Sequence, residues 1–262
     1  MHTRLMLEEE LTKAGIHPDD TVIVHSSMKK IGLVDGGGDT VIDALMDYFR
    51  NGLLVFPTLT YTLFHDYDLH APVCRQCLET HPAGHCLARE WVNGHPEFHV
   101  NTTPSCVGLL PNLFRVRPQV VRSLNPSHSV AAAGKEAEAF IAGHEQGTTP
   151  CGKKSPWWKL YLRRAKILHL GSPLSSSTFM HGVDEWMHPE VITPLIPNPV
   201  AVFDRHEQRV PMAPQHLTSG SANLLDKFEK TFEEMGALTR FPFGDTTALT
   251  LDCRMVADFF LL

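Results

Sequence analysis

The feature that most constrains the fold is a pattern near the N-terminus: a short buried run, a glycine turn, an amphipathic stretch and a second buried run. Thr21–His25 is mainly β-branched and sharply bounded, which is typical of a buried strand. Gly36–Gly38 follow, Asp39 is suited to cap a helix, and apolar residues recur at helical spacing as far as Phe49. Leu53–Phe56 is the second buried run. This order of strand, glycine loop, helix and strand predicts an α/β protein.

The rest of the chain alternates helical and strand patterns without a clean break. It has 262 residues, of which 43% are hydrophobic. A chain of this length buries enough surface to fold without disulfide or metal staples. We predict a single α/β domain over residues 1–262, with a central mixed sheet flanked by helices. Further helices are expected at 1–15, Gly108–Arg115, Lys135–Ala142, Trp157–Arg164, Thr178–Trp186, Ala222–Met235 and Asp252–Leu261, strands at Lys166–Leu170 and Thr247–Leu251, and a hairpin of Val200–Phe203 with Gln208–Val210.

Residues 61–101 differ from their surroundings, since they are rich in His, Cys, Pro and Asp and show little periodicity. We expect a long irregular excursion with a short helix at Leu87–Val92. Such long loops are usually functional or carry their own stabiliser. Closely spaced thiols and imidazoles can close a tetrahedral zinc site, and a structural zinc would stabilise a segment that lacks a core. The alternative is a loop with reduced free thiols. The candidate zinc ligands are Cys74, Cys77, His81 and Cys86.

Composition argues against several classes of function. The formal net charge is -6 and the isoelectric point is about 6.2, so nucleic-acid binding is not expected. No apolar run reaches the roughly 18–20 residues of a membrane span. The N-terminal segment is acidic where an export signal would be apolar, and six cysteines are too few for a secreted disulfide framework. We expect a protein of the reducing cytoplasm without membrane partners, and a homodimer on base rates.

The first candidate site follows the first strand. His25, Ser26 and Ser27 end that strand, Lys29 comes next, and Gly36–Gly38 open the helix. Glycines let backbone N–H groups approach an anion, and a helix N-terminus adds positive potential. The pattern matches neither a P-loop nor the GxGxxG fingerprint. It therefore indicates either a phosphate site or a tight turn with capping serines.

Two histidines define further candidate sites. His181 and Glu185 are four residues apart, so a helix places both on one face. A carboxylate beside an imidazole raises its basicity, as a general base requires; the alternative is a surface i,i+4 pair. His128, between Ser127 and Ser129, either lines a pocket or is a buried histidine whose hydrogen bonds are satisfied.

Six segments then occur in order between Val22 and Trp186: VHSSMKKIGLVDGGGDTVIDAL, FPTLT, TTPSCVGLLPNLFR, VVRSLNPSHSVAAAG, SPWWKL and STFMHGVDEW. Together they resemble the aminoglycoside 3-N-acetyltransferase family, antibiotic acetyltransferases that do not have the common GNAT fold. The resemblance covers most of the chain. It implies a single α/β domain that uses acetyl-CoA to acetylate an amine by direct transfer, without a covalent acyl-enzyme.

The same resemblance implies a role for each matching segment. His181 would be the general base that deprotonates the attacking amine, and Glu185 would orient it. On chemical grounds, backbone N–H groups or hydroxyls such as those of Ser129 and Thr178 are candidates to stabilise the oxyanion, and His128 is kept as a further catalytic candidate. The residues implied to hold acetyl-CoA are His25, Ser26, Ser27, Lys29, Gly32, Gly36, Gly37, Gly38, Thr102, Thr103 and Ser105.

The acceptor amine is left open. An aminoglycoside carries several positive charges, so its site should be lined with carboxylates, and Asp66 and Asp184 are the candidates. The family's loop before the TTPS segment is often rich in Asp and Trp, whereas here the Cys/His excursion takes its place, so another small amine is an alternative. Two further hypotheses are a metal-dependent hydrolase built from the Cys/His cluster and His181, and a CoA-binding protein without catalysis.

Overall fold

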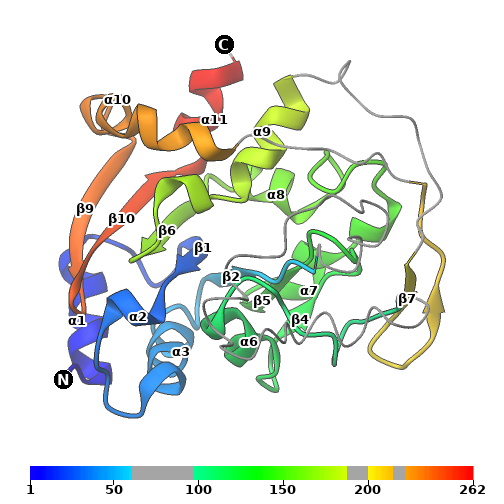
Figure 1. Ribbon diagram of the computed structural model, residues 1–262, viewed down its shortest axis with the longest axis horizontal. Helices are drawn as coiled ribbons and strands as arrows, with labels where there is room; N and C mark the ends of the chain where they lie inside the picture. The colour runs from blue at the N-terminus through cyan, green and yellow to red at the C-terminus, as the bar shows by residue number, and fades with distance from the viewer. Residues whose placement is uncertain (61–96, 188–199, 215–221, 262) are drawn as a thin grey trace, which may run out of the picture.

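A mixed sheet of seven strands forms the centre of the protein (Figure 1). The computed structural model describes residues 1–60, 97–187, 200–214 and 222–261. From one edge to the other the strands are β4 (Val121–Arg122), β5 (Val130–Gly134), β2 (Leu53–Pro57), β1 (Thr21–Ser26), β6 (Lys166–Leu170), β10 (Thr246–Asp252) and β9 (Leu238–Phe243).

The three central strands run parallel and carry the βαβ unit that the sequence predicts. β1 pairs with β2 on one side and with β6 on the other, both in parallel register. Helix α3 (Gly37–Tyr48) connects β1 to β2. The outer strands add on in antiparallel register, which makes the sheet mixed. One detail of the prediction is wrong: the N-cap of α3 is Gly36, at φ 77°, while Asp39 lies in the first turn. A left-handed backbone suits glycine, so the glycine turn starts the helix earlier.

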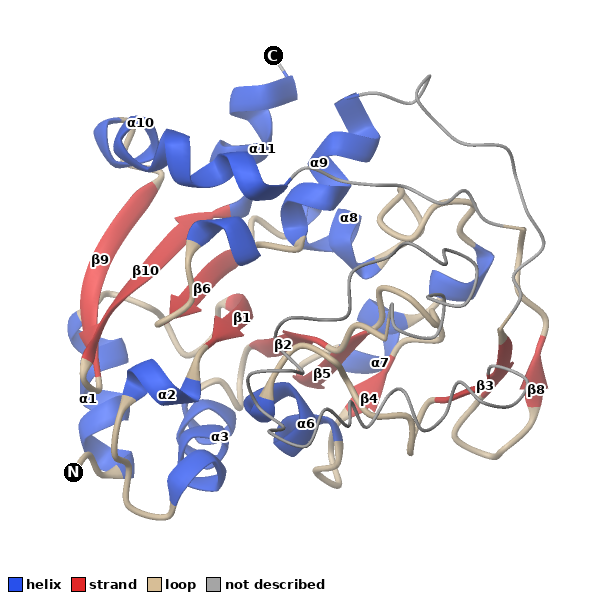
Figure 2. Ribbon diagram, viewed as in Figure 1, coloured by secondary structure: helices blue, strands red, loops and turns tan. Residues whose placement is uncertain are grey.

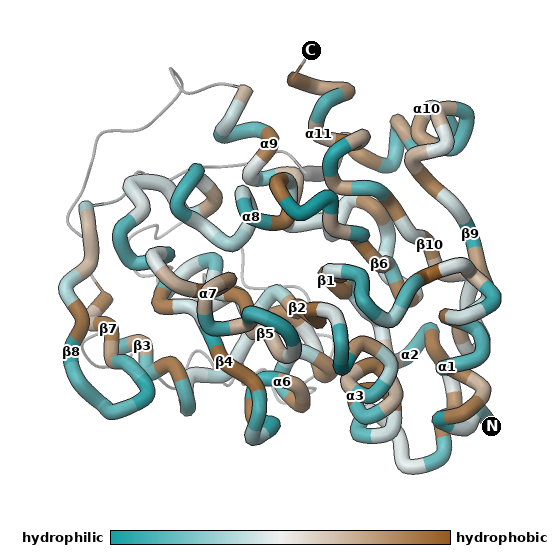
Figure 3. The backbone as a smooth tube through the Cα atoms, turned by 180° about the vertical axis from the view of Figure 1, so that it is seen from behind, coloured by the Kyte–Doolittle hydropathy of each residue, from teal (hydrophilic) through white to brown (hydrophobic). Residues whose placement is uncertain are grey.

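Helices cover both faces of the sheet (Figures 1 and 2). Along β1 the side chains alternate: Val22 and Val24 enter one core, and Ile23 enters the other. Figure 3 shows hydrophobic stretches along these central strands. The first face carries α1 (Arg4–Lys13), α2 (Met28–Ile31), α3 and α6 (Leu109–Arg115); the second carries α7 (Ala137–Ile141), α8 (Pro156–Leu162), α9 (Phe179–Met187), α10 (Glu229–Glu234) and α11 (Cys253–Leu261).

A smaller sheet of three strands lies beside the edge of the main sheet (Figure 2). It contains β3 (Glu97–His99), β7 (Ala201–Phe203) and β8 (Arg209–Val210). The predicted hairpin is thereby confirmed, because β7 and β8 pair in antiparallel register. The prediction of irregular structure up to residue 101 is wrong at its end, since β3 pairs in parallel with β7. That pairing joins residues about a hundred positions apart, which no local pattern announces.

Two other differences concern single elements. β9 is missing from the prediction because its sequence, LTRFPF, contains a proline and does not alternate cleanly. The helix expected from residue 222 begins as a 3-10 helix, η4 (Ala222–Phe228), and becomes α10 only afterwards. The predicted helix Leu87–Val92 lies outside the described residues. Two further 3-10 helices are η2 (His144–Gln146) and η3 (Leu174–Ser176).

No helix in the described ranges is both long and apolar enough to cross a membrane.

Candidate active site

A cavity of about 330 Å³ opens where the parallel strands β1 and β6 end. Ligands of open α/β sheets commonly bind at this carboxyl edge. His25 lines the cavity from the end of β1, Lys30 lines it from α2, and Ser172 lines it from the segment after β6. Gly171 permits this arrangement: its φ is 77°, and a Cβ there would lie 2.8 Å from the Cβ of Lys30. The glycine lets the two loops approach each other around the cavity.

The walls of the cavity are polar but carry no carboxylate among the described residues that line it. Hydroxyl groups come from both loops, and Lys30 supplies a cation. Val107 and Pro111 add apolar surface from the start of α6. The lining hydroxyl residues are Ser26, Ser27, Ser172, Ser175, Ser176 and Thr178. Such walls suit an anionic or neutral ligand better than a polycation.

His181 borders the same cavity from the first turns of α9, and its backbone N–H donates to the carbonyl of Thr178 at 3.0 Å. Burial lowers the pKa of His181 below 6.5, while the nearby charge of Asp184 acts to raise it. The Nδ1 atom is buried and has no hydrogen-bond partner among the described residues. The imidazole is therefore held neutral beside the cavity, in the form that can accept a proton.

The two carboxylates of α9 have different surroundings. Asp184, predicted to bind substrate, is the carboxylate that acts electrostatically on His181. Glu185, predicted to orient His181, accepts from the backbone N–H of Cys151 with both oxygens, at 3.2 and 3.1 Å. Trp186 holds the same segment, because its Nε1 donates to the carbonyl of Cys151 at 3.0 Å. These contacts join the end of α9 to Cys151, and the predicted contact between Glu185 and His181 stays a prediction.

His128 stands edge-on to His181, with ring centroids 5.8 Å apart. Its Nδ1 lies 3.0 Å from the hydroxyl of Ser127, and its backbone N–H donates to Asn125 at 2.8 Å. Burial, followed by the neighbouring His181 and His144, lowers the pKa of His128 to about 3. His128 does not line the cavity; it is a neutral neighbour of the proposed base.

The residues implied to hold acetyl-CoA fall into two groups. His25, Ser26 and Ser27 line the cavity, and the lysine that does so is Lys30 rather than Lys29. The remaining residues do not border it, so their contact with a cofactor stays a prediction: Gly32, Gly36, Gly37, Gly38, Thr102, Thr103 and Ser105.

Several residues of the second group contribute to packing or to hydrogen bonds within the fold. A Cβ at Gly38 would lie 2.7 Å from a methyl group of Leu113, so this glycine lets α3 pack against α6. The Thr103 hydroxyl accepts from the backbone N–H of His99 at 2.8 Å. The backbone N–H of Ser105 donates to Asn112 at 2.9 Å.

Ser129, one of the two hydroxyls considered for the oxyanion, is otherwise engaged. It is fully buried, donates to the carbonyl of Thr58 at 2.7 Å, and accepts from Arg122 Nε at 3.1 Å. Because a hydroxyl has a single proton to donate, Ser129 has none left for a ligand. Thr178, the other hydroxyl, does line the cavity.

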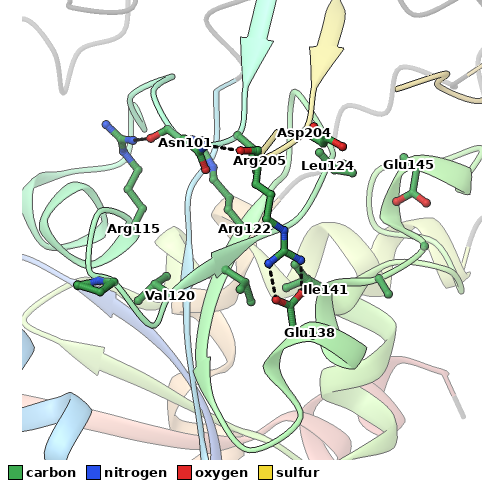
Figure 4. A pocket seen from close by; sticks show the side chains of 15 residues that line it. Asn101, Arg115, Val120, Arg122, Leu124, Glu138, Ile141, Glu145, Asp204 and Arg205 are labelled. Atoms are coloured by element: carbon green, nitrogen blue, oxygen red, sulfur yellow. Dashed lines mark hydrogen bonds and ion pairs between the residues drawn. The ribbon is translucent and has the colours of Figure 1, made fainter. Parts of the chain in front are cut away.

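A second cavity, of about 560 Å³, is lined from α7 and from the turn between β7 and β8 (Figure 4). Two of its charged residues are engaged: Arg205 makes two hydrogen bonds to Glu138, at 2.8 and 2.9 Å, and Arg115 donates to the carbonyl of Asn101 at 2.9 Å. None of the predicted site residues within the described ranges lines it. The cavity beside His181 is accordingly the candidate site.

The predicted metal ligands and Asp66 lie outside the described residues, so the zinc site stays a prediction. Within the described part of the chain, no group of three or more His, Cys, Asp or Glu side chains is placed to hold a metal ion.

Sequence analysis missed Lys30 and His169. His169 occupies an apolar run, KILHL, where an imidazole is unexpected. This unusual position is the only local signal for His169. Its contact with His25 on the neighbouring strand depends on the register of the two strands, which the local sequence does not give.

The fold and the site define an α/β protein with a ligand cavity at the carboxyl ends of parallel strands, bordered by a half-buried, neutral histidine. The family described as aminoglycoside 3-N-acetyltransferase matches residues 23–261, and the chain belongs to this family.

Two curated relatives illustrate the similarity. One is the SPbeta prophage-derived aminoglycoside N(3')-acetyltransferase-like protein YokD of Bacillus subtilis (strain 168), 32% identical over 188 residues, which are 68% of this chain and 63% of the relative. The other is aminoglycoside N(3)-acetyltransferase III of Acinetobacter baumannii, 34% identical over 183 residues, which are 69% of this chain and 59% of the relative. The aligned part thus spans less than two thirds of either relative.

Solved structures agree on the fold. The crystal structure of YokD from Bacillus subtilis superposes with a TM-score of 0.78 at 25% identity, over 99% of this chain and 92% of that chain. AAC-IIIb in a binary complex with CoASH superposes with a TM-score of 0.73 at 23% identity, over 99% of this chain and 95% of that chain.

Proposed function

We propose that this protein is an acetyl-CoA-dependent N-acetyltransferase that acts on an amine of an aminoglycoside or of a related small molecule. The observation that carries the proposal is the position of His181, a neutral imidazole that borders a polar cavity at the carboxyl edge of the sheet. Family membership, the relatives named as aminoglycoside acetyltransferases and the CoASH complex of AAC-IIIb support the same activity.

The cavity walls fit the acetyl donor. Acetyl-CoA carries phosphates, amides and a thioester, which call for a cation and for hydrogen-bonding groups. Lys30 supplies the cation, and hydroxyls such as those of Ser26 and Ser27 can bind amide or phosphate oxygens. The absence of carboxylates from the described lining residues avoids repulsion of a polyanion.

His181 then performs the proton chemistry. A protonated amine has no free lone pair, so the neutral amine is the form that attacks, and its nitrogen gives up one N–H proton as it bonds to the thioester carbon. His181 accepts this proton, and Asp184 stabilises the imidazolium that forms. When the carbon–sulfur bond breaks, the thiolate leaves and takes the proton from His181. The products are the amide and free CoA thiol, and the histidine returns to its neutral form.

Asp184 also affects which acceptor amine the site favours. A carboxylate one helical turn from the base, close to where the amine must arrive, favours a cationic substrate. An aminoglycoside or another polyamine satisfies this condition. The cytoplasmic location and the homodimer that we expect from the sequence are part of the same proposal.

The test is release of CoA thiol from acetyl-CoA in the presence of 2-deoxystreptamine antibiotics, diamines and amino sugars, with an enzyme-only blank for the cysteines. We expect turnover in the wild type and a loss of about 100- to 10,000-fold in His181→Ala, with CoA affinity by calorimetry unchanged. His206→Ala, at an exposed turn, is the matched control. CoA binding without turnover on any amine would instead identify a non-catalytic CoA-binding protein.

A further inference from the structure

Two buried histidines lie side by side on neighbouring strands at the centre of the sheet. His25 of β1 and His169 of β6 are partners in the parallel register. Their rings stack with centroids 5.0 Å apart and planes 15° apart. The residues are only 5% and 1% exposed. Both strands end at the cavity, so the stacked pair lies at its floor, and His25 is the member that lines it.

Each ring leaves one hydrogen bond unmade. The Nε2 atoms of His25 and His169 are buried and have no hydrogen-bond partner among the described residues. A buried polar atom without a partner destabilises a protein by about 1–3 kcal/mol, so a leucine at either position would avoid a penalty. Two such atoms side by side, beside a cavity, call for a functional explanation.

The unmade bonds also indicate which nitrogen of His25 carries the proton. A buried N–H without a partner is rarer in proteins than a buried acceptor without one, which favours a bare Nε2 and a protonated Nδ1. The Nδ1 of His169 lies 3.0 Å from the hydroxyl of Ser172, which fixes that ring. No described residue makes a hydrogen bond to the Nδ1 atom of His25, which is the second nitrogen of its ring. Its N–H is therefore available to a ligand in the cavity.

The ring of His25 is neutral in this setting. Burial, then the adjacent His169 and His181, holds its pKa well below 6.5. A neutral imidazole is a hydrogen-bond donor that carries no charge to repel a cationic amine. His25 and the proposed base His181 line the same cavity, so this donor and the base act on one site.

We propose that His25 is a further catalytic residue, whose Nδ1–H donates a hydrogen bond to the thioester oxygen of the acetyl donor, and that His169 is a positioning residue that holds the His25 ring. The inference rests on the proposed function and deepens it. As the amine bonds to the carbonyl carbon, the carbon–oxygen π electrons move to oxygen, and His25 stabilises that charge. They return when the carbon–sulfur bond breaks, so His25 gains and loses no proton.

The alternatives from the sequence are weaker donors here. The hydroxyl of Ser129 already donates its hydrogen bond to the carbonyl of Thr58. Thr178 lines the cavity, and a rotatable hydroxyl is less preorganised than a ring stacked between strands. Thr178→Val is therefore the matched control variant.

The first test needs no acceptor amine. Acetyl-CoA labelled with ¹³C at the carbonyl is bound to the protein, and its carbonyl stretch is measured by isotope-edited infrared spectroscopy. We expect a shift to lower frequency in the wild type and in His25→Gln, which keeps an N–H donor, and loss of the shift in His25→Leu. Thr178→Val should retain it. Acetyl-CoA that binds with the same carbonyl frequency in wild type and His25→Leu would overturn this inference alone, whereas failure of acetyl-CoA to bind the wild type would overturn the proposed function as well.

Turnover supplies the second test. Loss of one oxyanion donor lowers kcat by about 100- to 1,000-fold, so His25→Leu should show this loss with its affinity for CoA within twofold of the wild type. His169→Phe keeps a flat ring and should retain most of the wild-type kcat and of the carbonyl shift. His169→Leu should lose about tenfold in kcat at unchanged CoA affinity; if it does not fold, Ser172→Ala, which frees the ring of His169, replaces it. Equal kcat values for His169→Phe and His169→Leu would contradict the positioning role.

Discussion

Glu185 binds Cys151: both carboxylate oxygens accept from the backbone N–H of Cys151, at 3.2 and 3.1 Å. Trp186 binds the carbonyl of the same residue, so two consecutive side chains of α9 hold both backbone groups of Cys151. Trp186 also packs edge-on against Trp158 and Phe179. This clamp fixes the helix one turn beyond His181, and a rigid helix keeps a general base in place.

The clamp predicts that Glu185 contributes chiefly to stability. Hydrogen bonds to charged groups contribute about 1.5–3 kcal/mol, so Glu185→Ala should lower the free energy of unfolding by about 1–3 kcal/mol in urea titrations. Glu185→Gln keeps an acceptor oxygen and should lose less. A kcat loss in Glu185→Gln greater than that in Asp184→Asn would contradict a chiefly structural role and would support Glu185 as the residue that orients His181.

Asp184 should act on the pH dependence of catalysis. Burial lowers the pKa of His181 below 6.5, and Asp184 opposes that shift. The base works when neutral, so kcat/KM should hold down to a pH below 6.5 and then fall as the imidazole takes up a proton. Asp184→Asn should move this acid limb to lower pH and reduce kcat, because the imidazolium loses its stabilising charge. An acid limb that stays in place in the variant would rule out the interaction.

The buried histidines make the protein sensitive to acid. Burial lowers the pKa of His128 and His169 to about 3 and that of His144 to about 4. Below pH 6.5 these three imidazoles bind protons in the unfolded chain but stay neutral in the folded protein. The free energy of unfolding should therefore fall as the pH drops from about 6.5 toward 4. Each such group contributes up to about 1.4 kcal/mol per pH unit. Urea titrations across this range should show a slope that is smaller by one proton in His169→Leu.

Lys159 should stabilise the end of α7. Its ammonium donates to the carbonyls of Ala139, Phe140 and Ala142, at 3.0, 3.0 and 2.7 Å. Cations at a helix C-terminus satisfy the last carbonyls and interact favourably with the helix dipole. Lys159→Met keeps the aliphatic stem and should lower the free energy of unfolding by about 1–2 kcal/mol. Lys135→Met, at another site before the same helix, is a matched control, and an equal effect in both variants would contradict a specific role for Lys159.

Gly171 should be intolerant of a side chain. A Cβ at this position would lie 2.8 Å from the Cβ of Lys30, and the residue has φ 77°. Gly171→Ala therefore strains the backbone and pushes the two loops apart at the cavity. We expect a loss of about 1–3 kcal/mol in stability and weaker CoA binding by calorimetry. CoA affinity equal to that of the wild type would show that the two loops can separate without altering the site.

Much of the architecture is visible in local sequence. The β-branched run of β1, the glycine turn before α3 and the apolar run of β2 each have a strong local signal, and together they predict the parallel core. The pairing of β3 with β7 could not be predicted in this way, because it joins segments about a hundred residues apart and depends on tertiary contacts. β9 could not be predicted for a local reason: its sequence, LTRFPF, contains a proline and its burial does not alternate regularly.

Local patterns in the sequence are enough to predict the α/β class, the parallel core and the helix that carries His181, because periodicity and turn chemistry act over a few residues. The sequence also contains the segments by which the family was recognised. Which groups meet, in contrast, depends on tertiary packing. The register of β1 and β6 brings the ring of His169 against that of His25. The packing of α9 brings Glu185 to the backbone of Cys151. The close approach of the two loops at Gly171 makes Lys30, and not Lys29, a lining residue of the cavity. The physical reason is that spacing along a chain fixes the face on which a residue lies, while the group opposite it is set by the packing of distant segments.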